Sequence, residues 1–322
     1  MTIGSWVFIT SLILIVKHAR VVSYNTNNHN NVTGVQSSVE RFVANGVPYN
    51  KKKYAFVLSF VADKSVCSAT LVKPLFAVTA AHCTWNLEAG KSNVYRGHYD
   101  QAAKDDTIRR KVVHYYQHEQ FDINKNPFPD ISIIQIESEY AEIEEYAEIG
   151  GNPGDFKNGK LVKCIGVGFG KTEYQKLAKK NGYQYAVSMR YGPDACIGDT
   201  ADPKQWVNYL CSKPSIKQAC FGDSGGPTFC KGKFYAIYMS RYNYVIKDPQ
   251  IDFCGDPNIE TKHLFLFQYR NWIAGIVGPL PSSESGDNSR EYYDDEFASG
   301  SIPFNKRALM LLNSIVLCVV LF

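Results

Sequence analysis

The middle of the chain carries short runs of apolar or alternating apolar and polar residues, separated by residues that favour turns. Runs of this length fit β-strands, and few segments show helical spacing, so the pattern predicts an all-β sandwich or barrel. The apolar positions of residues 265–277 recur at near-helical spacing, and we expect a terminal helix there. The clearest strand candidates are residues 54–62, 68–72, 76–80, 131–136, 161–167 and 234–239.

The N-terminal region begins with an apolar run at residues 6–16 that is too short to span a bilayer comfortably. Its length fits the core of a signal peptide, and small residues allow a cut after Ser23. We therefore expect residues 1–23 to be a signal peptide of a secreted protein. A buried strand is the alternative for this run. Residues 24–40 are rich in Asn and Ser, and Asn31 begins a glycosylation sequon.

The C-terminal region has an acidic, polar stretch at residues 279–307 and an almost wholly apolar tail at residues 308–322. We interpret the first as a flexible linker. Small residues around Ser299, a polar spacer and a terminal apolar tail together form the pattern of a GPI-anchor signal. We expect Ser299 to be the attachment site of such an anchor, which would tether the protein to a cell surface. A tail-inserted helix and a plain hydrophobic extension are the alternatives.

The composition is that of an ordinary globular protein, with 45% hydrophobic and 20% charged residues among 322. A formal net charge of +4 is too small to argue for a nucleic-acid partner. The chain has nine cysteines, and all but Cys318 lie in the central region, where an even number fits disulfides and an oxidising compartment. The absence of CxxC pairs argues against a zinc or redox motif. We expect no metal ion and no cofactor.

Three segments carry residues suited to nucleophilic catalysis. His82 lies in TAAHC, Asp130 lies in FPDISII, and Ser224 lies in CFGDSGGP. A serine hydroxyl needs a base within reach, histidine can take and return a proton near neutral pH, and a carboxylate can orient that histidine. Glycines around Ser224 allow a tight turn that aims the N–H groups of Gly222 and Ser224 at a developing oxyanion. Each segment alone also has a structural reading, as a core histidine, a capping aspartate or a surface turn.

Together these strings, in the order His, Asp, Ser, resemble the chymotrypsin-like serine protease family over about residues 42–278. The resemblance implies two six-stranded antiparallel β-barrels of the chymotrypsin type with a C-terminal helix, and a catalytic triad of His82, Asp130 and Ser224. The activity implied is peptide-bond hydrolysis by a serine endopeptidase through an acyl-enzyme. The partners implied are a polypeptide substrate, an activating protease and a serpin-type or other protein inhibitor.

The resemblance also implies how the cysteines pair, which their spacing alone leaves open. All eight central cysteines are used, and Cys318 in the apolar tail is left over. The implied pairs are Cys67 with Cys83, Cys164 with Cys230, Cys196 with Cys211, and Cys220 with Cys254.

Activation in this family creates a new N-terminus whose ammonium group pairs with the aspartate before the serine, here Asp223. A cut after Arg41 gives Phe42 as the first residue, whereas a cut after Phe42 gives Val43, which is closer to the usual apolar terminus. We favour the Arg41–Phe42 bond, so that residues 24–41 form a propeptide and Phe42 pairs with Asp223.

The primary substrate pocket departs from the trypsin-like pattern. Gln218 stands at its base, where trypsin-like members have an aspartate that binds Lys or Arg, so we do not expect trypsin specificity. Arg241 and Thr261 stand at walls that are usually glycine. Bulky walls make the pocket shallow, and Arg241 across its mouth would favour small or acidic side chains. The alternative is that Arg241 points to solvent.

The segment beside this pocket usually reads Ser-Trp-Gly, and its serine supports the catalytic aspartate. Here Ser240 takes that role, or Met239 holds the place and leaves Asp130 one partner short. The tryptophan and glycine are absent. These departures support an alternative function, that of a weakly active or inactive binding protein on the protease scaffold.

Overall fold

The computed structural model describes seven segments of the chain, which lie between residues 45 and 281. None of the helices in these segments has the length and hydrophobicity needed to cross a membrane. Several predictions lie outside the described residues: those for the signal peptide, Asn31, the propeptide, Phe42, Ser299 and the apolar tail. Of the predicted acidic linker, only residues 279–281 are described. The described segments are residues 45–62, 65–97, 105–124, 129–171, 181–196, 205–246 and 254–281.

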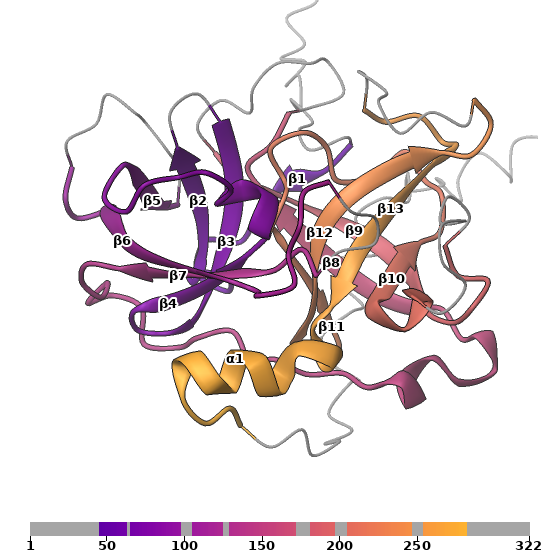
Figure 1. Ribbon diagram of the computed structural model, residues 1–322. Helices are drawn as coiled ribbons and strands as arrows, with labels where there is room; N and C mark the ends of the chain where they lie inside the picture. The colour runs from indigo at the N-terminus through magenta and orange to yellow at the C-terminus, as the bar shows by residue number, and fades with distance from the viewer. Residues whose placement is uncertain are drawn as a thin grey trace, which may run out of the picture. The chain divides into compact units, whose positions relative to one another are not determined.

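The first barrel is built from six antiparallel strands. These are β2 (Val57–Ala62), β3 (Ser65–Lys73), β4 (Phe76–Thr79), β5 (Ser92–Arg96), β6 (Arg109–Gln117) and β7 (Ser132–Ile136). They follow one another around the barrel in the order β2, β3, β4, β7, β6, β5, and β5 pairs back with β2 to close it. Figure 1 shows this barrel in indigo to purple.

The second barrel is built mainly from the later strands. These are β1 (Val47–Pro48), β8 (Val162–Gly168), β9 (Tyr183–Arg190), β10 (Tyr209–Ser212), β11 (Pro227–Cys230), β12 (Lys233–Asn243) and β13 (Ile259–Phe265). The order β9, β10, β13, β12, β11, β8 closes because β8 also pairs with β9, and β1 adds a short pairing to β9. The two six-stranded antiparallel barrels confirm the predicted fold class.

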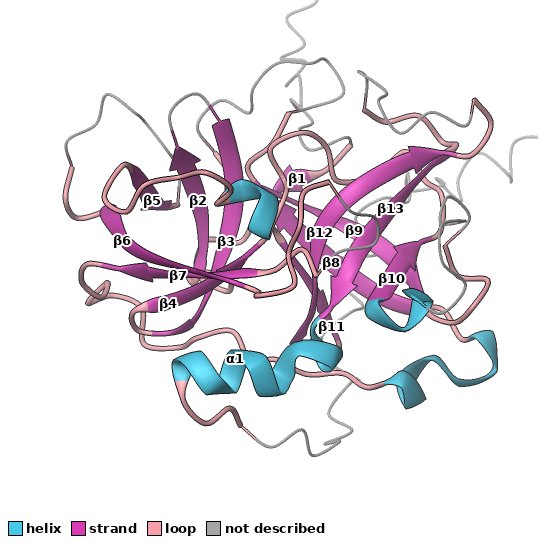
Figure 2. Cartoon of the chain, viewed as in Figure 1, coloured by secondary structure: helices cyan, strands magenta, loops and turns pink. Residues whose placement is uncertain are grey.

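Helical structure is short and lies outside the barrels (Figure 2). The predicted terminal helix is present as a 3-10 turn, η4 (Leu266–Tyr269), followed by α1 (Arg270–Val277). Its C-cap is Gly278, which adopts a φ of 85° that glycine tolerates better than other residues. The remaining 3-10 turns are η1 (Ala81–Cys83), η2 (Pro153–Gly159) and η3 (Gln205–Asn208).

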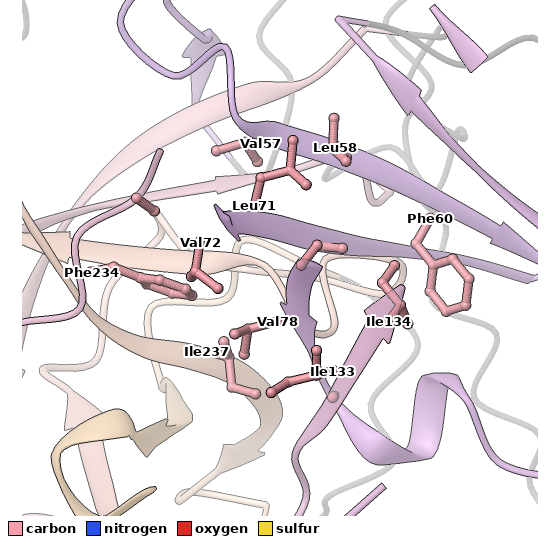
Figure 3. Close-up of a cluster of buried hydrophobic side chains, with 14 of the residues drawn as sticks. Val57, Leu58, Phe60, Leu71, Val72, Val78, Ile133, Ile134, Phe234 and Ile237 are labelled. Atoms are coloured by element: carbon pink, nitrogen blue, oxygen red, sulfur yellow. The ribbon is translucent and has the colours of Figure 1, made fainter. Parts of the chain in front are cut away.

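One continuous hydrophobic cluster holds the two barrels together. Figure 3 shows Leu71, Val78 and Ile133 of the first barrel in the same cluster as Phe234 and Ile237 of the second. Each fully buried side chain of this kind contributes about 1.5–3 kcal/mol relative to exposure. The shared core therefore fixes the loops of one barrel against those of the other.

Candidate active site

His82 and Asp130 lie at the same end of the first barrel. His82 follows β4 and Asp130 precedes β7, and these two strands are antiparallel neighbours in which Thr79 pairs with Ser132. His82 Nδ1 lies 2.6 Å from Asp130 Oδ2, and the His82 backbone N–H donates to Asp130 Oδ1 at 2.8 Å. Because Asp130 is only 1% exposed, its carboxylate is shielded from water and holds the imidazole in one orientation.

The electrostatics of this pair favour a charged imidazole. Burial acts to lower the pKa of His82, whereas the charge of Asp130 and their hydrogen bond act to raise it, and the net effect is a raised pKa. Within the described residues, both hydrogen bonds to Asp130 come from His82, while Ser240 is exposed and Met239 is half-buried. Among the described residues, Ser240 therefore does not bond to Asp130, which fits the alternative expectation that Asp130 is one partner short.

Ser224 lies where the second barrel contacts the first. Its carbonyl oxygen accepts a hydrogen bond of 2.8 Å from the Ser68 N–H, and it lies 3.8 Å from the sulfur of Cys83, the residue after His82. The next residue, Gly225, has a φ of 75°, and a Cβ there would lie 2.2 Å from Thr79 Oγ1. Glycine is therefore required for this close approach. The structure brings all three predicted triad residues to the junction of the barrels.

The comparison with known families agrees with this geometry. The family model described as Trypsin matches residues 43–272, which is most of the chain. The chain belongs to the trypsin family.

Several relatives in the trypsin family share about a quarter of their residues with this chain. Mouse chymase is 24% identical over 72% of this chain and 87% of its own length. Human kallikrein-2 is 24% identical over 67% of this chain and 81% of its own length. A protein of Crotalus adamanteus named "Inactive snake venom serine proteinase 13" is 22% identical over 73% of this chain and 86% of its own length.

The eight cysteines among the described residues form the four disulfides that the resemblance to this family implies. Cys67 and Cys83 also lie close to His82, but their sulfur atoms are bonded to each other, so this group does not resemble a metal site. The Cys67–Cys83 disulfide ties the turn that carries His82 to β3. The full set is Cys67–Cys83, Cys164–Cys230, Cys196–Cys211 and Cys220–Cys254.

Asp223, the residue before Ser224, is 1% exposed and held by backbone groups. Its Oδ1 accepts from the Gly170 N–H and its Oδ2 accepts from the Cys220 N–H, each at 2.7 Å. Burial raises the pKa of Asp223 to about 7, although these amides and the charge of Arg241 act in the opposite direction. The carboxylate is therefore costly to ionise in this surrounding, so a further positive charge would stabilise it.

Gly222 adopts a conformation that L side chains rarely take, with a φ of 93°. The turn around it is closed by a hydrogen bond of 3.0 Å from the Asp223 N–H to the Cys220 carbonyl. This turn orders the backbone that leads into Ser224.

Gln218 and Thr261 are both buried and form hydrogen bonds with neighbouring groups. The Gln218 amide nitrogen donates to the Ser215 and Asp256 carbonyls at 2.7 and 2.9 Å, whereas its Oε1 has no partner among the described residues. Thr261 Oγ1 lies 2.8 Å from His263 Nε2. The groups that the resemblance assigns to the base and wall of the substrate pocket at these two positions are therefore neutral.

Arg241 is only 5% exposed, so the expectation that it points to solvent is wrong. It pairs with Thr261 across the β12–β13 ladder, and its Nη1 donates to the sulfurs of Cys220 and Cys254 at 3.3 and 3.2 Å. Its guanidinium carbon lies 4.0 Å from the centre of the Phe221 ring. The side chain therefore packs between the Cys220–Cys254 disulfide and the Phe221 ring.

Sequence reasoning missed two residues beside this region. Phe221 is 41% exposed and carries Arg241 on its ring, and His263 is fully buried between two threonine hydroxyls. For Phe221, the only sequence signal was its position directly before Gly222. The sequence around His263 gave no such signal.

Proposed function

We propose that this protein is a serine endopeptidase that hydrolyses peptide bonds through an acyl-enzyme. Ser224 is the nucleophile, His82 takes and returns its proton, and Asp130 orients His82. The N–H groups of Gly222 and Ser224 stabilise the oxyanion. The observation that carries the proposal is the buried Asp130 carboxylate, which holds both the ring and the backbone of His82 beside the segment of Ser224.

A fluorophosphonate probe tests this proposal, because it reacts only with an activated serine. We expect the probe to label the cut, folded wild-type protein and not the Ser224→Ala variant. Ser240→Ala is the matched control, since Ser240 is exposed and makes no hydrogen bond to Asp130 within the described residues. Failure of the wild-type protein to react would overturn the proposal.

Activation is proposed to occur by a cut at the Arg41–Phe42 bond by another protease. The new ammonium group of Phe42 would pair with Asp223, which offers a buried carboxylate held by two backbone amides. An unpaired buried charge is unfavourable, so this pair would fix the loop that carries Gly222. N-terminal sequencing of active protein tests the position of the cut. A terminus at Tyr24 with full activity would exclude activation by this route.

The primary specificity is proposed to be for small or acidic side chains rather than for Lys or Arg. Gln218 supplies no charge at the base, and the buried Arg241 occupies space near the pocket wall and repels cations. A cleavage profile on a peptide library tests this proposal. A profile dominated by Lys or Arg before the cut bond would contradict it.

A second function, a weakly active or inactive binding protein, is favoured by one observation. Asp130 lacks a serine partner within the described residues. One relative also carries the word inactive in its name. The fluorophosphonate experiment separates the two functions, because a silent binder does not react even after the cut.

The protein is proposed to be secreted, with residues 1–23 removed as a signal peptide, glycosylated at Asn31, and tethered by a GPI anchor at Ser299. Its partners would then be extracellular polypeptides, including a serpin-type or other protein inhibitor. Treatment of expressing cells with a phosphatidylinositol-specific phospholipase should release the protein. Retention on the cells would exclude the anchor.

A further inference from the structure

A cavity of ≈ 410 Å³ lies beside the segment that carries Asp130. Pro129 lines it, and His118, which also lines it, donates its backbone N–H to the Ile131 carbonyl at 3.1 Å. The cavity therefore contacts the residue before Asp130 directly and the residue after it through His118. None of the predicted triad residues lines it. Its volume falls in the range of small-molecule sites, which is about 300–1,000 Å³.

The aromatic side of this cavity is formed by His118, Tyr269 and Trp272. The centre of the His118 ring lies 5.1 Å from that of Trp272, and the two ring planes form an angle of 33°. The centre of the Tyr269 ring lies 5.7 Å from that of His118, with an angle of 88° between the planes. The indole N–H of Trp272 donates to the carboxylate oxygens of Glu119 at 3.2 Å. Trp272 is thus fixed in place, with its N–H already engaged, and it offers ring surface to a ligand rather than a hydrogen-bond donor.

The polar side of the cavity is formed by amides, namely those of Gln120, Gln205, Asn208 and Gln268. Asn208 Nδ2 donates to Gln205 Oε1 at 2.8 Å, which fixes these two side chains against each other. In the segments that the structure describes, the amide nitrogen of Gln205 and the side-chain amide of Gln120 form no hydrogen bond. Side-chain amides both donate and accept hydrogen bonds, so this side of the cavity can donate to hydroxyl groups and accept from them.

The cavity carries little charge. Among the described residues that line it there is no Lys, Arg, Asp or Glu. Burial lowers the pKa of His118, although the charge of Glu119 acts in the opposite direction, and the net effect favours the neutral imidazole. An anionic ligand would lose hydration there without gaining a counter-charge, which is unfavourable.

We propose that this cavity binds a neutral sugar residue of a glycan. A sugar ring presents an apolar C–H face, which would stack on the aromatic side, and hydroxyl groups, which would pair with the amides of Gln120 and Gln205. A proline-rich peptide also binds aromatic grooves. The engaged indole N–H of Trp272 makes the peptide the weaker candidate, because that donor is not available to a peptide carbonyl.

Binding can be tested on the full-length expressed protein carrying Ser224→Ala, which prevents self-cleavage. The neutral probes are chitotriose, mannotriose and lactose, and the comparison ligands are a sulfated heparin hexasaccharide and a proline-rich peptide. Calorimetric titration should show that at least one neutral probe binds with a Kd of about 1 mM or below. Binding confined to the sulfated sugar or to the peptide, or no binding at all, would overturn the proposal.

Variants locate the binding site. The pair Gln120→Ala and Gln205→Ala, at solvent-accessible positions, should weaken binding of the neutral probe at least tenfold, which is about 1.4 kcal/mol. Asn271→Ala is the matched control, because Asn271 is an exposed amide on α1 that does not line the cavity. Trp272→Ala should abolish binding, whereas Trp85→Ala, which removes an exposed tryptophan elsewhere, should leave it unchanged. Equal affinity in the cavity variants and the wild-type protein would place the sugar elsewhere and refute the proposal.

Discussion

The guanidinium carbon of Arg241 lies 4.0 Å from the centre of the Phe221 ring. A cation over an aromatic face gains about 0.5–2 kcal/mol, with the larger values at desolvated sites. Arg241 belongs to β12, whereas Phe221 lies in the turn that leads to Ser224, so this contact joins β12 to the turn that precedes Ser224. The contact also keeps the long side chain inside the protein, at the position that we propose as a wall of the substrate pocket.

Removal of this side chain should widen the pocket. We expect Arg241→Gly to raise kcat/KM about 10–200-fold for peptides with large apolar side chains before the cut bond. An apolar pocket distinguishes substrates that differ by one methylene group by about this factor. A peptide-library cleavage profile measures the change. Arg109→Ala, on the first barrel, is the control and should leave the profile as it is. An unchanged profile in Arg241→Gly would show that Arg241 does not limit the pocket.

Asp130→Asn should lower kcat by about 10⁴-fold while the fold is kept. The amide would present its N–H₂ group to His82 Nδ1, which now lies 2.6 Å from a carboxylate oxygen, and would favour the wrong tautomer of the imidazole. Steady-state hydrolysis of a peptide substrate measures the loss. Asp106→Asn, at an exposed site, should keep full activity. If kcat of Asp130→Asn fell by less than tenfold, Asp130 would not be a member of the catalytic triad.

Gly170→Ala should disturb the loop of Gly222. A Cβ at Gly170 would lie 2.5 Å from the Phe221 carbonyl oxygen and 2.6 Å from the Asp223 nitrogen, and backbone atoms do not move aside cheaply. Because the proposed oxyanion donors lie in this loop, we expect kcat to fall by about 10²–10³-fold.

The matched control for this change is Gly275→Ala in α1, where nothing lies within 4 Å of the new Cβ. It should keep full activity and raise the free energy of unfolding by up to about 1 kcal/mol, because alanine favours helix over glycine. Thermal unfolding and peptide hydrolysis are measured on both variants. Full activity in Gly170→Ala would contradict the role of the loop.

His263 should make the protein sensitive to acid. Its two ring nitrogens lie 2.8 Å from the hydroxyls of Thr228 and Thr261, and burial lowers its pKa from 6.5 to about 3. The unfolded chain takes up this proton near pH 6.5, whereas the folded protein does not until about pH 3. Stability therefore falls as pH falls through this window, by up to about 1.4 kcal/mol per pH unit.

Urea unfolding at a series of pH values measures this slope. His263→Gln should flatten it between about pH 6.5 and pH 4, because the titrating group is gone. His114→Gln is the control and should leave the slope unchanged, because His114 is exposed. The same slope in wild type and His263→Gln would refute the role of His263.

The apolar runs of the sequence located the strands that are buried on both faces. The predicted runs correspond to β2, β3, β4, β7, β8 and β12, in which most side chains are buried. The run of β6 was missed, because its sequence RRKVVHYYQ is largely polar and only Val112 is buried. Such a strand is held by its backbone pairing with β5 and β7, which no local pattern reveals.

The sequence by itself determined which residues could form a triad, because the chemistry of His82, Asp130 and Ser224 and the glycines beside Ser224 are local properties of three segments. The antiparallel pairing of β4 with β7 decided that His82 meets Asp130, and the packing of the two barrels decided that the backbone of Ser224 lies beside Ser68 and Cys83 of the first barrel. Tertiary structure alone decided that Arg241 is buried on Phe221, because the direction of a long side chain depends on which disulfide and ring surround it.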